Sequence, residues 1–142
     1  MSDRRPFQYA ILRVVPRVER GERINVGVVL FCPQRRFIAV TIELDEARLA
    51  ALDPSLDPRD VRPHLDAIAA VVAGDPAAGM LAELPPSERF GWVSAQSSTV
   101  IQPSEVHTGL TADPERTLDH LFAALVRLFS STPQRSCPKL DA

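Results

Sequence analysis

The residue with the clearest capacity for chemistry is His107, in the polar stretch Glu105-Val-His-Thr-Gly109. An imidazole titrates near neutral pH, so an exposed histidine beside a hydroxyl can serve as general base for a serine or threonine nucleophile. Three hydroxyl residues, at 97–99, precede it, but none stands in the Gly-x-Ser-x-Gly turn that presents a serine nucleophile. The alternative is that His107 bonds a backbone carbonyl and fixes its loop. His107 is therefore a candidate general base, with ligand binding and a structural role left open.

A guanidinium and several hydroxyls near the same stretch could bind an anion. Arg89 precedes the hydroxyl run at 97–99, and such donors make charge-assisted hydrogen bonds to a phosphate or a carboxylate. Residues of this kind also form turns that satisfy their own backbone. Two further polar residues, Arg13 and Asn25, stand inside apolar segments, where a buried arginine would need an acidic partner. The candidate ligand-binding residues are Arg13, Asn25, Arg89, Ser97, Ser98, Thr99, His107 and Thr108.

Motifs for the common cofactors are absent from the sequence. It contains no Gly-x-Gly-x-x-Gly run and no phosphate loop ending in Gly-Lys-Ser/Thr. The three histidines, His64, His107 and His120, lie far apart and do not form a metal-binding spacing. Cys32 and Cys137 are not a Cys-x-x-Cys pair, which favours two free thiols over a disulfide. We therefore expect no metal and no cofactor.

The composition indicates one globular domain. The chain has 142 residues, of which 45% are hydrophobic and 24% charged, enough to bury a core of its own. No apolar run approaches the roughly 20 residues that cross a bilayer. The polar start Met1-Ser-Asp-Arg-Arg-Pro6 has no signal core. We expect a single cytoplasmic domain over residues 1–142.

Three segments of strand composition open the chain. Residues 7–15 and 37–42 are rich in β-branched and aromatic side chains, and 24–32 is apolar on both alternating faces, as in a central strand. That alternation places Asn25 and Gly27 on one face. A glycine inside a central strand usually marks a bulge or the close approach of another backbone or a ligand, and we favour a helix or loop packed over Gly27. Short polar connections predict antiparallel pairing of the three strands.

The charge is unevenly distributed along the chain. The net charge of −2 argues against a dedicated nucleic-acid binder, yet residues 1–36 carry eight arginines and three acidic residues. Up-and-down order of the first three strands would place Arg4 and Arg5 at the same end of the sheet as Arg35 and Arg36. This end could bind an acidic partner, or could hold only solvated turn charges.

Three helices follow from capping residues and apolar spacing. Asp45 is the expected N-cap of the first. Asp60 is the expected N-cap of the second, which puts Pro63 in its first turn, and Gly74 ends it. Asp113, followed by proline, begins a core helix with leucines and phenylalanines at helical spacing. The predicted helices are 46–52, 61–73 and 114–130.

The fold class that these elements predict is α+β. We expect a two-layer domain with a mostly antiparallel sheet of four or five strands and three helices packed on it. Residues 104–110 are expected to form an irregular connection. The ordered core should span residues 7–131, followed by a mobile tail at 132–142. The predicted strands are 7–15, 24–32, 37–42, 89–93 and 99–102.

Four motifs occur in a characteristic order: Tyr9-Ala-Ile-Leu-Arg13, Gly21-Glu-Arg-Ile-Asn-Val-Gly-Val-Val29, Ser97-Ser-Thr-Val-Ile-Gln102, and Val106-His-Thr-Gly-Leu110 followed by Asp113-Pro114. In these motifs the chain resembles the bacterial domain-of-unknown-function family 3037. In that pattern an arginine often precedes the Ser-Ser/Thr pair, where this chain has Gln96 or Ser97, which argues against an anion site that depends on that arginine. The resemblance assigns no reaction. It implies a small cytoplasmic protein, similar to proteins encoded beside HipA-like kinases, and so an accessory or partner role.

These observations favour a protein-interaction or small-ligand-binding module over an enzyme. We expect its site in the 95–110 segment, with Arg89, the hydroxyl run and His107 converging near Asn25 or Arg13. The partner could be a HipA-like kinase or another protein. The alternative is a small hydrolase or phosphotransfer enzyme that uses His107 as general base.

Overall fold

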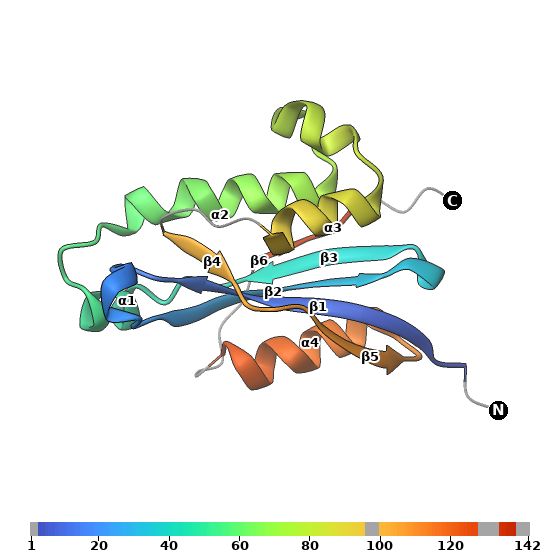
Figure 1. Cartoon of the computed structure of the whole chain (residues 1–142), viewed down its shortest axis with the longest axis horizontal. Helices are drawn as coiled ribbons and strands as arrows, with labels where there is room; N and C mark the ends of the chain where they lie inside the picture. Colours follow the sequence, from blue (N-terminus) through green and yellow to red (C-terminus); the bar gives the residue numbers. More distant parts are fainter. Residues whose placement is uncertain (1–2, 96–99, 128–133, 139–142) are drawn as a thin grey trace.

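The structure, a computed structural model, describes residues 3–95, 100–127 and 134–138, and a six-stranded antiparallel sheet runs through its centre (Figure 1). The strands are β1 (Arg5–Val14), β2 (Ile24–Cys32), β3 (Phe37–Ile42), β4 (Ile101–Pro103), β5 (His107–Thr111) and β6 (Gln134–Ser136). Their order is β4-β1-β2-β3-β6, and β5 also pairs with β1. The predicted α+β class with an antiparallel sheet is confirmed, although four or five strands were predicted.

Helices cover both faces of the sheet, so the domain has three layers where two were predicted. They are α1 (Glu46–Leu52), α2 (Pro58–Ala73), α3 (Pro86–Ala95), α4 (Pro114–Leu125) and the 3-10 helix η3 (Pro76–Glu83). In Figure 1, α2, α3 and η3 lie on one side of the sheet, and α4 lies on the other. No single helix of the described part is long and apolar enough to cross a membrane, although α2 and η3 together, bent by 55°, have that length and composition.

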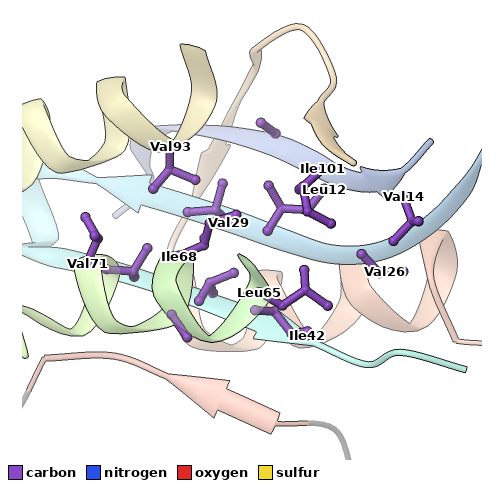
Figure 2. Close-up of a cluster of buried hydrophobic side chains, with 14 of the residues drawn as sticks. Leu12, Val14, Val26, Val29, Ile42, Leu65, Ile68, Val71, Val93 and Ile101 are labelled. Atoms are coloured by element: carbon purple, nitrogen blue, oxygen red, sulfur yellow. The ribbon is translucent and has the colours of Figure 1, made fainter. Parts of the chain in front are cut away.

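Each face of the sheet carries its own hydrophobic core. The larger core lies under α2 and α3, where Figure 2 shows Ile68, Val71 and Val93 against Val29 of the central strand. The smaller core lies under α4, where Leu118 and Phe122 pack on Val28 and Leu30. Two apolar faces explain why hydrophobic residues dominate both alternating faces of β2.

A β-bulge in β2 overturns the predicted alternation. Arg13 lies opposite Asn25 while Leu12 lies opposite Gly27, so Val26 is the extra residue. Asn25 therefore faces α4, and the space for a Cβ on Gly27 faces the larger core. Such a Cβ would lie 2.9 Å from the carbonyl oxygen of Thr41. The backbone that requires this glycine belongs to the neighbouring strand β3, instead of the helix or loop that we predicted.

Two of the three predicted helix N-caps are confirmed. The Asp45 carboxylate accepts hydrogen bonds from the first turn of α1, and Asp113 does the same for α4. The predicted N-cap of α2 was wrong, because Asp57 followed by proline caps the helix three residues earlier. Pro63 consequently lies inside α2 and not in its first turn. Gly74, with φ of 68°, ends α2 as predicted.

Residues 89–93 were predicted as a strand but belong to α3. The aromatic and β-branched side chains suggested a strand, yet the helix starts at Pro86 with Glu88 in its first turn. Phe90 and Val93, three positions apart, are buried against the larger core. Here the helix start and tertiary burial outweigh local strand propensity.

Two short strands were not predicted. Residues 107–111 form β5 within the predicted irregular connection, and residues 134–136 form β6 within the predicted tail. Each is held by pairing with a strand distant in sequence, β1 and β3 respectively. The third predicted helix, 114–130, begins as expected, but α4 ends at Leu125, and residues 128–130 lie outside the described part.

Candidate functional site

The characteristic motif around His107 lies on one edge of the sheet. β4 and β5 both run antiparallel to β1, β4 beside Leu12–Val14 and β5 beside Arg5–Tyr9. Between them, the backbone N–H of Ser104 donates to Ile11 O over 2.7 Å, and its Oγ accepts from Ile11 N over 2.8 Å. The Ser104 hydroxyl thus takes the place of a backbone carbonyl in the hydrogen bonding to β1. As a result, residues 101–111 run along β1 like a single strand with one interruption.

The motif residues themselves pack against aromatic rings on the α4 side. The His107 ring lies 5.1 Å from that of Tyr9, tilted by 31°, and Tyr9 stacks on Phe7 at 6.0 Å. A Cβ on Gly109 would lie 2.7 Å from the Phe7 ring, so only glycine fits under that ring without displacing it. His107 and Gly109 therefore have packing roles that bind β5 to β1.

Polar side chains continue this face toward β4. Arg13 of β1 lies opposite Asn25 of β2 on one side and opposite Gln102 of β4 on the other side. The Asn25 side-chain amide donates to Leu125 O at the end of α4 over 3.0 Å. Burial lowers the pKa of the Arg13 guanidinium, the charge of Arg23 lowers it further, and Glu105 acts in the opposite direction. Arg13 has no ion pair within the described residues.

The predicted site residues do not form one cluster. Arg13, Asn25 and His107 share the α4 side of the sheet, whereas Thr108 alternates to the opposite side. Arg89 belongs to α3, which covers that opposite side. Ser97, Ser98 and Thr99 lie outside the described residues. The structure therefore brings three of the predicted residues onto one face and separates Arg89 from them.

Arg89 instead closes the C-terminus of α2. Its Nη1 donates to Val71 O over 3.3 Å and to Val72 O over 3.1 Å, and only 7% of the residue is exposed. A cation is favourable where the helix dipole ends in unpaired carbonyls. Burial lowers the pKa of this guanidinium. Sequence reasoning missed this role because it placed Arg89 in a strand.

The outer side of β5 is an open edge. In an antiparallel strand, every second residue directs its backbone N–H and C=O to the same edge. Ile11 and Val15 of β1 direct theirs to the edge where β4 lies. Phe7 and Tyr9 therefore direct theirs to the same edge, where β5 lies. The backbone groups of His107 and Gly109, which lie opposite Tyr9 and Phe7, are thus hydrogen-bonded to β1. Thr108 and Leu110 consequently direct N–H and C=O outward, and no other described strand pairs with this side. Leu110 is 60% exposed, and the preceding Val106 is 40% exposed.

A hollow of about 480 Å³ lies where β5 ends and α4 begins. Among the described residues that line it are Arg4, Arg116, His120 and the carboxylate of Asp113, whose Oδ1 caps α4. The lining residues are Arg4, Leu110, Thr111, Ala112, Asp113, Arg116, Thr117, His120 and Leu121. The sequence signal for this cationic surface was the i, i+4 spacing of Arg116 and His120, which puts both on one face of α4.

The arginine-rich end of the sheet forms as predicted, and Asp3 partly neutralises it. The Asp3 carboxylate lies 2.9 Å from Arg35 Nη2 and 3.5 Å from Arg5 Nη2. The hydrogen bond and the charge of Arg35 hold the Asp3 pKa below its usual value, while desolvation acts in the opposite direction and the charge of Arg5 lowers it further. Asp3 thus brings together Arg5 at the start of β1 and Arg35 in the turn between β2 and β3, next to the hollow that Arg4 lines.

Within residues 3–95, 100–127 and 134–138, His107 makes no hydrogen bond to a hydroxyl, and its contact is the Tyr9 ring. The same residues contain no group of three His, Cys, Asp or Glu side chains able to hold a metal ion. The described geometry supplies neither a nucleophile for His107 nor a metal centre.

Comparison with known proteins gives one family match. The model of the family described as "Protein of unknown function (DUF3037)" matches residues 9–126, which include β1 from Tyr9 onward, β2 to β5 and α4. No curated protein and no solved structure matches the chain. Since the match covers most of the chain, including Tyr9 and the open edge of β5, the protein belongs to the DUF3037 family.

Proposed function

We propose that this protein is an interaction module that binds an extended acidic segment of a partner protein along the outer edge of β5. The observation that carries the proposal is the unpaired edge at Thr108 and Leu110, with the exposed side chains of Val106 and Leu110 beside it. An exposed strand edge is a ready template for another strand, and soluble proteins usually cover or charge such edges. β5 contains no lysine, arginine, aspartate or glutamate.

Strand addition would use the backbone of β5. Thr108 and Leu110 each offer one N–H and one C=O, so an antiparallel segment can form up to four hydrogen bonds with them. In this mode of recognition, backbone bonds supply affinity, and side-chain pockets select the sequence. Exposed Leu110 and Val106 favour apolar residues at alternate positions of the added segment.

The hollow beyond Leu110 supports a preference for acidic residues. A segment that continues past the end of β5 would reach Arg116 and His120 on α4, and Arg4 on the strand side. Guanidinium groups bind carboxylates through charge-assisted hydrogen bonds. Complementary charge also accelerates encounter and selects against basic partners.

The resemblance to proteins encoded beside HipA-like kinases suggests the kind of partner. In this proposal, a HipA-like kinase carries the acidic segment, and both proteins act in the bacterial cytoplasm. The chain would then be an accessory protein without a reaction of its own.

A pair of substitutions at one position tests strand addition. Thr108→Pro removes the outward N–H, which β1 does not use, and proline is tolerated at a strand edge. Thr108→Val keeps the N–H and a β-branched side chain. The probe is a blocked peptide that alternates valine and glutamate, titrated against each variant by calorimetry, with a valine–glutamine peptide for comparison.

The proposal predicts that Thr108→Val binds the glutamate peptide as the wild type does, and that Thr108→Pro binds it at least about tenfold more weakly. The glutamine peptide should bind more weakly than the glutamate peptide to the wild type. Equal affinity of the proline and valine variants would refute binding at the β5 edge. Equal affinity for the two peptides would refute the acidic preference.

A further inference from the structure

A second hollow, of about 680 Å³, lies on the opposite side of the sheet from His107, at the C-terminus of α2. Its volume is in the range of small-molecule binding sites. It is lined by Ala73, Gly74, Asp75, Pro76, Ala82, Arg89, Cys137 and Pro138. The edge-binding function of β5 makes no use of this hollow.

Arg89 brings a buried positive charge to this hollow. The residue is 7% exposed, and its Nη1 bonds two backbone carbonyls of α2. Its Nε is buried and has no hydrogen-bond partner among the described residues, and no described carboxylate forms an ion pair with it. A buried charge is usually paired, because its desolvation costs free energy that carbonyl dipoles offset only in part.

The one described acid that lines the hollow is engaged elsewhere. Asp75 Oδ1 accepts a hydrogen bond from Ala77 N over 2.9 Å and so caps η3. Gly74 leaves the guanidinium its space, since a Cβ there would lie 2.8 Å from Arg89 Nη1. The remaining wall is largely apolar, formed by small residues of α2 and η3 and by Pro138.

We propose that this hollow binds a small organic carboxylate, with Arg89 as its anion-binding residue. The guanidinium carries the charge that attracts a carboxylate, and its Nη2 makes no hydrogen bond with the described residues and can donate to one. The alanine and proline walls accommodate a short aliphatic body. The bound anion would supply the counter-charge that the described residues do not provide for Arg89.

The test titrates the protein with butyrate and, separately, with the neutral isostere butyramide at matched ionic strength. Two-dimensional NMR follows the backbone amides of Gly74 and Asp75 and the Arg89 Nε–H signal. Saturable shifts at these three signals with butyrate, and none with butyramide, are the expected result. Identical shifts with both compounds, no saturable shift with butyrate, or saturable binding of inorganic phosphate alone would each overturn the carboxylate assignment.

Two variants locate the binding. Arg89→Met removes the guanidinium and should abolish the butyrate shifts, but it also removes the cap of α2 and could unfold the protein. Ala82→Leu fills the hollow and leaves the bonds from Arg89 to Val71 and Val72 in place. A loss of butyrate affinity of at least about tenfold in the leucine variant is expected, whereas wild-type affinity would overturn the proposed position.

Discussion

At the scale of single residues, His107 and Gly109 are explained by packing, and Thr108 between them is the one that faces outward. The two packed residues contact Tyr9 and Phe7 respectively, and through them they hold β5 against β1. Since the backbone bonds of Thr108 are directed away from β1, it is available to a partner. The motif thus packs β5 firmly against β1 through His107 and Gly109 and leaves the backbone of Thr108 unpaired on the outer edge.

The close contact between Gly109 and Phe7 predicts a clear cost for a methyl group. In Gly109→Ala the new Cβ would lie 2.7 Å from a ring that is 7% exposed, so the ring or the strand must shift. Overpacking of this kind costs about 1–3 kcal/mol. Urea unfolding followed by circular dichroism should show this loss of unfolding free energy.

Gly91 provides the matched control. It lies in α3, is exposed, and has nothing within 4 Å of an added Cβ. Gly91→Ala should stabilise the protein by up to about 1 kcal/mol, because alanine is the better helix former. If Gly109→Ala were as stable as Gly91→Ala, the packing role given to Gly109 would be wrong.

Residue types were predicted better than their surroundings. The glycine in β2 correctly indicated a bulge or the close approach of a backbone, and both occur there, but the pattern did not show that the bulge falls at Val26 and turns Asn25 to the other face. An acidic partner was expected for Arg13 if that residue were buried, whereas Arg13 is half-buried and the deeply buried arginine is Arg89, bonded to carbonyls. Partners of this kind come from distant parts of the chain, so spacing alone cannot reveal them.

At the scale of elements, Arg135 holds the edge strand β6 to both the sheet and α4. Its Nε donates to Thr41 Oγ1 of β3 over 2.7 Å, and its guanidinium pairs with Asp119 and Glu115 of α4. Thr41 is almost fully buried, and the Arg135 side chain is 24% exposed. A single arginine thus links three elements at this side of the domain.

Removing this link should destabilise the protein measurably. Arg135→Met loses the charged hydrogen bond and leaves Thr41 Oγ1 without its donor, a loss of about 1–3 kcal/mol. Arg59→Met is the control, because Arg59 pairs with Asp57 at an exposed site and should change stability by no more than about 0.5 kcal/mol. Equal unfolding free energies for the two variants would contradict the role of Arg135.

Elements with strong local signals were predictable, and elements made by pairing were not. The bounds of β2, β3 and α1 match the prediction, because composition, turns and the Asp45 cap all agree. β5 and β6 are short and polar and exist through their pairing with β1 and β3. At α3 the local signal itself was misleading, because residues with strand propensity follow a helix start and were predicted as a strand.

At the scale of the whole molecule, positive charge gathers at the end of the sheet where β1 begins and β2 turns into β3. Asp3 moderates it by pairing with Arg5 and Arg35. The β5 edge and the hollow lined by Arg4 and Arg116 lie at the same end. The neutralising acid should therefore influence how strongly an acidic partner is attracted.

Asp3→Asn tests this influence. Removing the carboxylate takes away the ion pairs of Asp3 with Arg5 and Arg35, so the valine–glutamate peptide should bind about threefold more tightly at low salt. The gain should shrink as added salt screens the exposed charges. Surface plasmon resonance at two salt concentrations measures both effects, and unchanged affinity at low salt would show that this end of the sheet does not attract the partner.

Amide hydrogen exchange at the β5 edge, with and without the valine–glutamate peptide, tests the central claim most directly. Thr108 and Leu110 should exchange rapidly in the free protein and at least about tenfold more slowly in the complex, because strand addition bonds their N–H groups. His107 and Gly109, already bonded to β1, should be protected in both states. Peptide binding that leaves Thr108 and Leu110 unprotected would contradict the account.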